Sequence, residues 1–360
     1  MIPYLFLAAW VLLCWLLNYR GFLGRQAFLV AVLVPCWALL ALRGASVGED
    51  TSMYLYMARV ADGLSWRDVL VPWGSIIWNM NEWGYGSTVD MGYLALCKLV
   101  MAIFDDPQWV LAVCSAVICA GFGRFLYHCD EDVAQSFWCF LCSGLYMFAF
   151  NGMRQMLAMA IGVQCICSMR RGHLGRAVLF VAVASLVHKS SLVFLFVILV
   201  FTLLGRKQSA YASILILTAA LPLFVGVLEP LVSYISPQYA SYFSNNYWEA
   251  QIGGIILWWA VIMACLFAAI RGRAGASLDA KTVVVCSFAY LALEACSLRV
   301  SILERVALYM LPFVCQLLPQ AKALVPEKNR WWFSLGANLV LLFMFVSYAA
   351  SPTRAYMFCT

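Results

Sequence analysis

Residues 27–51 have the sequence AFLVAVLVPCWALLALRGASVGEDT, an apolar run that ends in a strongly polar cluster. The run 27–42 contains no charged residue, whereas 43–51 contains Arg43, Glu49 and Asp50. An ionisable group at the edge of a bilayer core is costly in free energy, so it usually marks a site or a pathway rather than packing. Similar clusters end other apolar runs, at 151–155, 188–191 and 304–305. If these clusters share one membrane face, they form a charged cavity there.

The composition places the chain among membrane proteins. Its 360 residues are 65% hydrophobic and 11% charged, and the mean hydropathy is +0.88, whereas a soluble domain has about 25% charged residues. We therefore predict a single all-α membrane domain over 1–360. The first apolar run, 2–17, has no basic segment before it and no cleavage site after it, which favours a retained span over a signal peptide. The net charge of +6 is modest, and in a membrane protein it arises mostly from basic residues in cytoplasmic loops. It therefore gives no indication of nucleic-acid binding.

The cysteines give no metal signature. All fifteen are scattered through the chain, most of them inside apolar runs, as small buried side chains are. Cys139 and Cys142 have a metal-like spacing, but no second pair and no histidine stands near them in the sequence. We therefore expect neither a disulfide framework nor a bound metal or other cofactor.

Hydropathy and positive charge together predict the topology, because a helical span needs about 20 apolar residues and cytoplasmic segments are enriched in Lys and Arg. The predicted spans are 2–18, 27–42, 109–127, 136–150, 153–169, 177–187, 190–204, 211–228, 255–270, 282–297, 303–318 and 332–349. Thirteen Lys or Arg lie in the segments 19–26, 170–176, 205–208, 271–281 and 319–331. The comparably long segment 229–254 has none. The basic segments are therefore predicted to face the cytoplasm, and 229–254 the outside.

A further apolar run, 91–104, is predicted not to cross the membrane. Three predicted spans already connect the external segment after residue 42 to the cytoplasmic segment 170–176, so a fourth crossing would place 170–176 outside. The run is also short and is followed by two aspartates and a proline, which suits a re-entrant or interfacial helix. The result is about twelve transmembrane helices plus this one, with both termini outside and the external loops 43–108 and 229–254 over the presumed site.

Two arginines are candidate ligands for an anion. Arg154 stands at the start of an apolar helix, where the helix dipole disfavours a cation, so a bound anion such as a phosphate explains it best. The bland alternative is an interfacial arginine that snorkels to water. Arg305 is the second candidate, with Tyr309 one helical turn beyond it on the same face. Glu304, however, could simply neutralise Arg305 or Arg299.

Two residues are candidates for proton transfer. His188 lies in a tight turn between two apolar runs, and an imidazole is suited to proton transfer near neutral pH. A histidine that satisfies neighbouring backbone carbonyls is an equally good interpretation. Asp50 follows Gly48, which permits a tight turn, and could instead only cap the next helix. Capping alone would leave the nearby Arg43 unexplained. The aromatic residues of the external loops suit either an interfacial belt or stacking on sugar rings.

Four motifs follow one another along the chain in a fixed order. Their residues are Arg43, Gly44, Gly48, Asp50, Thr51 and Tyr54; Asn151, Arg154, Gln155 and Ala158; His188 and Ser190; and Arg305 and Tyr309. No single motif is specific, but the ordered set resembles the EpsG family of Wzy-like polysaccharide polymerases over nearly the whole chain. One segment departs from the family pattern, which often has Glu-Pro-Gly-Tyr/Phe before the non-crossing helix. Asp90-Met91-Gly92-Tyr93 stands here, so either Asp90 or Glu82 takes the place of that glutamate.

The resemblance implies an enzyme of the bacterial cytoplasmic membrane that acts on its extracytoplasmic face. A growing glycan would leave its polyprenyl diphosphate and join the non-reducing end of a new lipid-linked repeat unit, giving a capsular, exo- or O-antigen polysaccharide. Arg154, Arg305 and Arg43 would hold the diphosphate and stabilise charge as it departs. His188 or Asp50 would be the base, and no metal is required. The other expected substrate contacts are Thr51, Tyr54, Asn151, Gln155, Ser190, Arg299, Tyr309, Glu82 and Asp90.

The resemblance also implies partners and leaves rivals. A chain-length regulator and a flippase of the same pathway are expected as partners from the resemblance alone. One rival function is a flippase or another transporter of lipid-linked oligosaccharides, but transporters often place charges near the midplane between repeated halves, and no internal repeat is visible here. A second rival is an O-antigen-ligase-like glycan transferase. A structural or assembly subunit would tolerate substitution of Arg154, His188 and Arg305.

Overall fold

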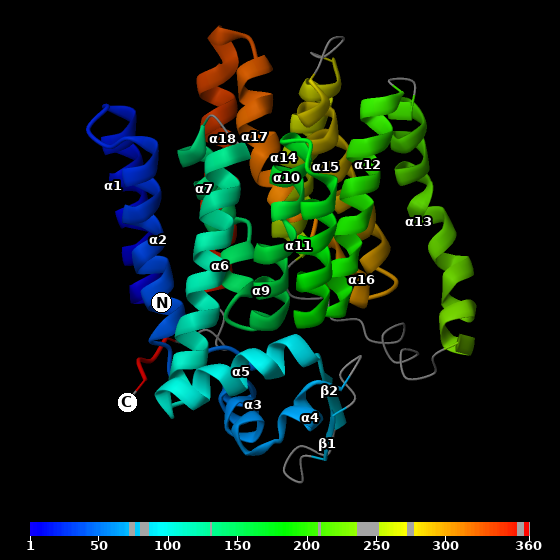
Figure 1. The fold of residues 1–360 in the computed structure, drawn as a ribbon. Helices are drawn as coiled ribbons and strands as arrows, with labels where there is room; N and C mark the ends of the chain where they lie inside the picture. The colour runs from blue at the N-terminus through cyan, green and yellow to red at the C-terminus, as the bar shows by residue number, and fades with distance from the viewer. Residues whose placement is uncertain are drawn as a thin grey trace. The chain divides into compact units, whose positions relative to one another are not determined.

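The computed structural model describes residues 1–71, 76–79, 86–129, 132–207, 210–235, 252–271, 277–350 and 356–359, and nearly all of these are helical (Figure 1). The first half of the chain forms α1 (Ile2–Tyr19), α2 (Arg25–Ala41), α3 (Thr51–Gly63), α4 (Trp66–Val69), β1 (Ile76–Asn79), β2 (Gly86–Val89), α5 (Met91–Phe104), α6 (Gln108–Cys129), α7 (Val133–Cys142), α8 (Leu145–Phe148), α9 (Met153–Gly162) and α10 (Gln164–Arg170). The second half forms α11 (Leu174–Val187), η1 (Lys189–Val193), α12 (Phe194–Arg206), α13 (Ala210–Ile235), α14 (Ile252–Arg271), α15 (Leu278–Ser297), α16 (Ile302–Ala307), α17 (Leu311–Leu324) and α18 (Glu327–Ala349).

Every run predicted as a span contains at least one helix, but the predicted count of about twelve spans is not confirmed. Among the described residues five helical segments are long and apolar enough to cross a membrane, namely Ile2–Tyr19, Gln108–His128, Lys189–Arg206, Leu278–Ser297 and Glu327–Ala349. The other apolar helices contribute shorter stretches to this comparison, such as Ala210–Pro222 within α13 and Ile256–Arg271 within α14. The chain is therefore a helical membrane protein, and the number of crossings stays a prediction.

Three of the predicted spans are interrupted, and local residues account for two of the breaks. The run 136–150 divides into α7 and α8 at Gly144, whose φ of +90° is a conformation that favours glycine. The run 303–318 divides into α16 and α17, where Pro312 occupies the first turn of α17. Proline is favoured at a helix start because its missing N–H is not needed there. The run 153–169 divides at Val163 into α9 and α10.

A short hairpin departs from the all-helical prediction. In the external segment β1 and β2 pair antiparallel, with Ile76 opposite Val89 and Asn79 opposite Gly86. The strands precede α5, which begins and ends at the residues predicted for the non-crossing helix.

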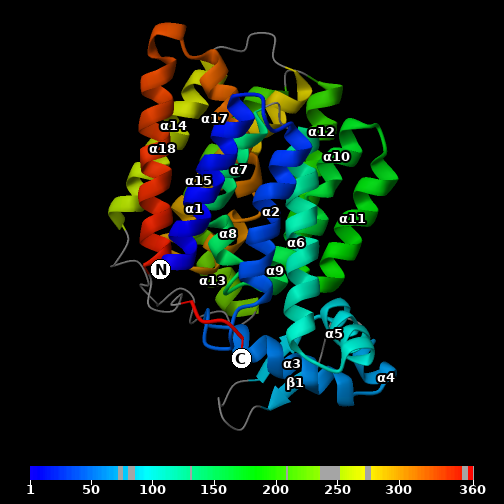
Figure 2. The ribbon, with the colours of Figure 1, turned by 90° about the vertical axis from the view of Figure 1, so that its left-hand side faces the viewer.

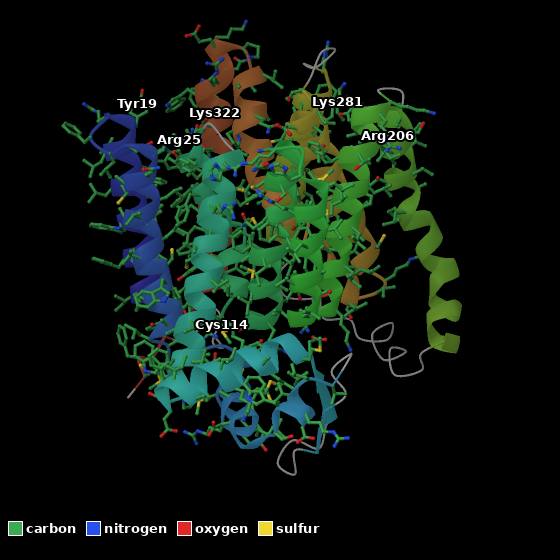
Figure 3. All side chains as sticks on the ribbon, viewed as in Figure 1. Tyr19, Arg25, Cys114, Arg206, Lys281 and Lys322 are labelled. Carbon is green, nitrogen blue, oxygen red and sulfur yellow. The ribbon has the colours of Figure 1, made fainter. Side chains whose placement is uncertain are left out.

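The chain divides into two compact units. Unit 1 comprises Met1–Ala134, Tyr146–Phe194 and Val346–Thr360, and unit 2 comprises Gln135–Leu145 and Leu195–Phe345. In unit 2, buried Val200, Leu204 and Val285 form one core cluster between α12 and α15. Arg206, Lys281 and Lys322 of the predicted cytoplasmic segments gather at one end of its helices (Figure 3).

In unit 1, α1, α2, α6, α9 and α11 run alongside one another, and α5 runs across one end of this bundle (Figures 1 and 2). Close approach of α6 and α9 depends on Gly121, because a Cβ there would lie 2.7 Å from the Ala160 carbonyl oxygen. The Gln164 side chain, at the start of α10, donates to the Gly121 carbonyl at 2.8 Å and so joins α10 to α6. Tyr19 and Arg25 lie at the end of the bundle away from α5 (Figure 3).

The C-terminal segment lies at the other end of the unit 1 bundle, the end that carries α5 (Figure 1). The Gly44 N–H donates to the Met357 carbonyl at 2.7 Å, and the Cys359 N–H donates to the Leu42 carbonyl at 2.8 Å. The Tyr356 hydroxyl donates to the Leu39 carbonyl at 2.8 Å. The last residues that the structure describes are therefore hydrogen-bonded to the end of α2 and to the segment that follows it.

Candidate active site

The polar motifs of unit 1 converge on the turn that precedes α9. The Arg43 side chain is completely buried. Its Nη1 donates to the Ala149 carbonyl at 3.1 Å, its Nη2 lies 3.6 Å from the Met153 sulfur, and its guanidinium lies 5.4 Å from the centre of the Phe150 ring. Burial lowers the pKa of Arg43, although a guanidinium stays charged in proteins. Arg43 therefore fastens the end of α2 to the turn before α9.

Gly48 lets the next segment lie directly on that turn. Its φ is +81°, and a Cβ at this position would overlap the Phe150 carbonyl oxygen. The Thr51 hydroxyl then donates to the Val47 carbonyl, and the Glu49 N–H donates to the Asn151 side-chain oxygen at 3.3 Å. Backbone and side chains of the first two motifs are thus tied together over about 100 residues of sequence.

Tyr54 completes this contact and brings Asp50 with it. The Tyr54 hydroxyl donates to the Asn151 carbonyl at 2.6 Å and lies 3.4 Å from Oδ2 of Asp50. Burial, with a smaller effect of Asp50, raises the pKa of Tyr54, so the hydroxyl keeps its proton as a donor. Asp50 occupies the N-cap position of α3, yet its side chain accepts no capping hydrogen bond there. Asp50 therefore stands at the predicted cap position without making the side-chain bond of a helix cap.

Arg154 lies in the first turn of α9, where no acidic residue is present to offset its charge. Its guanidinium lies 5.9 Å from the centre of the Tyr93 ring. Its Nη1 is buried and has no hydrogen-bond partner within the part of the chain that the structure describes. A buried donor on a charged group that lacks an acceptor costs free energy, and the positive end of the helix dipole adds to that cost. An anion bound at this place would remove both penalties.

His188 and Asp90 form a second polar group on neighbouring elements. His188 Nδ1 lies 3.4 Å from Asp90 Oδ2, and Lys189 Nζ lies 3.8 Å from Asp90 Oδ1. The imidazole is near the carboxylate but is not aligned with it for a hydrogen bond. Tyr93 stands three residues after Asp90 in α5 and edge-on to Tyr54, with ring centres 6.2 Å apart. The first turn of α5 thus adjoins both polar groups.

The remaining predicted site residues have different positions. Gln155 is buried, whereas Ser190 is exposed. In unit 2, Arg299 and Arg305 are exposed and Tyr309 is completely buried. The prediction that Arg305 and Tyr309 share a helical face is wrong, because α16 ends at Ala307. Glu82 and residues 236–251 of the second external loop lie outside the described residues.

Sequence reasoning missed two residues of this region. Lys189, the neighbour of His188, was assigned no role from the sequence. Its signal was its positive charge, which favours a carboxylate close by. Tyr93 contributes a ring beside Arg154. Its signal was the segment Asp90-Met91-Gly92-Tyr93, in which only the acidic residue received a role.

A model of the EpsG family matches residues 26–359, which include every candidate residue above. No curated protein and no solved structure matches the chain.

Proposed function

Because the chain belongs to the EpsG family, we propose that it is an extracytoplasmic glycosyltransferase that polymerises polyprenyl-diphosphate-linked oligosaccharide repeat units. Membership of this family, whose members are Wzy-like polymerases, supports a role in polysaccharide polymerisation. The lipid-linked donor, the acceptor and the extracytoplasmic face are the finer parts of the proposal. The product would be a capsular, exo- or O-antigen polysaccharide made at the bacterial cytoplasmic membrane.

The buried Nη1 of Arg154, which has no hydrogen-bond partner among the described residues, is the observation that carries this proposal. A polyprenyl diphosphate presents the anion that the buried Nη1 lacks, and a planar guanidinium is matched to phosphate oxygens. The first N–H groups of a helix have no acceptor within the helix, so those of α9 are further candidate donors to an anion beside Arg154. Preformed donors of this kind stabilise the charge that develops as the diphosphate departs. The surrounding contacts of Arg43, Gly48 and Tyr54 fix the turn before α9 and thereby the position of Arg154.

The reaction forms one glycosidic bond and breaks one bond to phosphate. The acceptor hydroxyl oxygen attacks the anomeric carbon of the donor sugar, and the carbon–oxygen bond to the diphosphate breaks. The diphosphate leaves with the electron pair of that bond. The hydroxyl proton moves to His188, which acts as the general base. Asp50 is the alternative base, and its carboxylate lies beside Tyr54 at the start of α3.

The wider context is part of the same proposal. The outward-facing end of unit 1 would receive the substrate, with about twelve spans and the non-crossing α5 at the membrane surface. In α5, Leu99, Ile103 and Phe104 are exposed apolar side chains, which suit contact with lipid. A chain-length regulator and a flippase of the same pathway are the proposed partners.

The test is glycan chain length in a strain that lacks this gene. The strain is complemented with the natural protein or with Arg154→Ala, His188→Ala or Arg305→Ala at equal membrane levels. Arg124→Ala is the matched control, because Arg124 is exposed on α6 near the end that carries Arg25. We expect long chains with the natural protein and the control, and single repeats with Arg154→Ala and His188→Ala.

Other outcomes point to the rival functions. Accumulation of lipid-linked repeats on the cytoplasmic side in the deletion strain would replace the polymerase with a flippase. Full-length chains that stay on the lipid carrier would replace it with a ligase. Long chains in both Arg154→Ala and His188→Ala would show that the charged region is structural.

A further inference from the structure

Asp90 and His188 come from segments 98 residues apart, and their side chains nevertheless face each other. His188 Nδ1 lies 3.4 Å from Asp90 Oδ2. Asp90 is nearly buried, with 11% of its side chain exposed, whereas 29% of the His188 side chain is exposed. One nitrogen of the imidazole therefore lies close to a shielded carboxylate, although the two are not aligned for a hydrogen bond in this conformation, and the side chain keeps access to its surroundings.

Local sequence builds this approach. Gly92, in the first turn of α5, packs on the end of α11, since a Cβ there would lie 2.7 Å from the backbone of Leu186. His188 follows at the end of α11 in an extended conformation, with φ −157° and ψ 114°. A larger residue at position 92 would push the two helix ends apart. The absence of a side chain at Gly92 thus sets the distance between Asp90 and His188.

Asp90 stands at the start of α5 but does not cap this helix with its side chain. It occupies the N-cap of α5, yet its side chain makes no capping hydrogen bond to that helix. Its carboxylate instead lies near two basic side chains. Oδ2 is on the side of His188, and Oδ1 lies 3.8 Å from the Lys189 ammonium. An aspartate at an N-cap ordinarily stabilises its own helix, so its use elsewhere indicates a different role.

We propose that Asp90 is the positioning residue that prepares His188 to act as the base of the transfer reaction. This inference rests on the function proposed above and deepens it. A neutral imidazole carries one proton, on either Nδ1 or Nε2. A carboxylate beside Nδ1 favours the proton on Nδ1 and leaves Nε2 free to accept the proton of the acceptor hydroxyl.

The same carboxylate serves the next stage of the step. When Nε2 takes the hydroxyl proton, the oxygen uses the freed electron pair to bond to the anomeric carbon, and the diphosphate leaves with the pair of the broken bond. His188 is then positively charged, and the neighbouring Asp90 carboxylate stabilises that charge. Lys189 Nζ lies 3.8 Å from the other carboxylate oxygen and favours the charged form of Asp90. Asp90 itself takes no proton.

The experiment is a double-mutant cycle on the purified protein in lipid nanodiscs. The substrate is the lipid-linked repeat unit extracted from the strain that lacks this gene, and the measurement is the initial rate of release of polyprenyl diphosphate. We expect His188→Ala to lower kcat by about 10²- to 10⁴-fold. Asp90→Asn should lower kcat by about 10-fold or more with KM unchanged, since it acts through the same base.

The decisive variant is the double substitution Asp90→Asn with His188→Ala. If Asp90 acts through His188, the double variant equals His188→Ala alone within about twofold, because independent sites would instead multiply their effects. Asp90→Glu should recover part of the rate lost in Asp90→Asn. Asp62→Asn is the matched control, because Asp62 is an exposed aspartate on α3, and it should keep the natural rate.

The outcomes separate this inference from the function itself. Multiplied effects in the double variant, or a natural rate in Asp90→Asn, would overturn the role of Asp90 while polymerisation stands. No release of diphosphate by the natural protein would overturn the proposed function and the inference with it. Thermal unfolding in detergent identifies any variant that has lost its fold. If Asp90→Asn is such a variant, Asp90→Ala takes its place in the cycle: an effect on kcat that disappears when His188 is already alanine supports the inference, and an effect that multiplies with that of His188→Ala overturns it.

Discussion

Arg43 and Arg154 approach the same turn of unit 1 from two sides, but their surroundings differ. Arg43 is completely buried, and its two terminal nitrogens contact the Ala149 carbonyl and the Met153 sulfur. Only its Nε lacks a partner among the described residues. Arg154 is half-buried, stands in the unfavourable field of a helix start, and has a buried Nη1 without an acceptor. Arg43 therefore stabilises the contact between two segments of the chain, whereas Arg154 is placed to bind a ligand.

The comparison separates two reasons for placing a charge near a membrane surface. A buried cation with protein partners stabilises the local fold, and its removal leaves those partners unsatisfied. A cation without such partners is costly in the free protein and becomes favourable only when an anion binds. The first kind of residue should control stability, and the second kind should control activity. The four predictions below test this division.

The largest effect is expected at Arg154. Arg154→Gln should lower the turnover rate by about 10²- to 10³-fold, as removal of one charge-stabilising donor does. The thermal unfolding temperature should stay unchanged or rise slightly, because an unfavourable charge leaves the start of α9. Initial rates in nanodiscs and unfolding in detergent measure the two quantities. A variant that loses stability together with activity would place Arg154 in the same class as Arg43.

Gly48→Ala tests the region around Arg43 through the backbone. The left-handed conformation and the overlap with the Phe150 carbonyl should together cost about 3 kcal/mol of unfolding free energy. Gly63→Ala is the matched control, because Gly63 ends α3, the helix that follows Gly48, and its added Cβ would meet nothing within 4 Å. Equal unfolding temperatures for the two variants would contradict the close contact between the motifs.

Arg43→Met keeps the length of the side chain and removes its donors. The Ala149 carbonyl would lose its partner, which should cost about 1–3 kcal/mol of unfolding free energy. The activity that remains should follow the fraction of folded protein rather than fall independently. A fully stable Arg43→Met variant without activity would show that Arg43 also binds substrate, as the sequence alone suggested.

Tyr54→Phe should have the smallest effect of the four. The change removes one hydrogen bond to the Asn151 carbonyl and should cost about 1 kcal/mol of unfolding free energy. The turnover rate should fall by less than the rate of Arg154→Gln, because Tyr54 acts on the position of the turn rather than on the ligand. A loss of activity as large as that of Arg154→Gln, with stability retained, would instead place the Tyr54 hydroxyl among the reacting groups.

Local patterns in the sequence predicted the helices well where a helix end has a local cause. The run 91–104 became α5 with both ends as expected, and Asp105 ends it with a left-handed φ of 52°. The turn at His188 and the helix start at Met153 also agree. The spans that divide at Gly144 and Pro312 were predicted as continuous, because hydropathy averages over a glycine or a proline that interrupts a helix.

The site was harder to predict because it depends on contacts between distant segments. Arg43 ends an apolar run and Arg154 begins one. Only folding places Arg43 against the Ala149 carbonyl and leaves the buried Nη1 of Arg154 without an acceptor among the described residues. The approach of Asp90 to His188 has no local signal except Gly92. A glycine by itself does not distinguish a helix contact from a loop. The pairing of residue 44 with Met357 has no local signal at all.

The central claim is that Arg154 binds the diphosphate of a lipid-linked substrate. The most direct measurement is the affinity of the purified protein for polyprenyl diphosphate without sugar, determined by native mass spectrometry in detergent. The natural protein and Arg124→Gln should bind it equally, and Arg154→Gln should bind it at least about 10-fold more weakly, since one charge-assisted contact contributes about 1.5–3 kcal/mol. Equal affinity of Arg154→Gln and the natural protein would contradict the account.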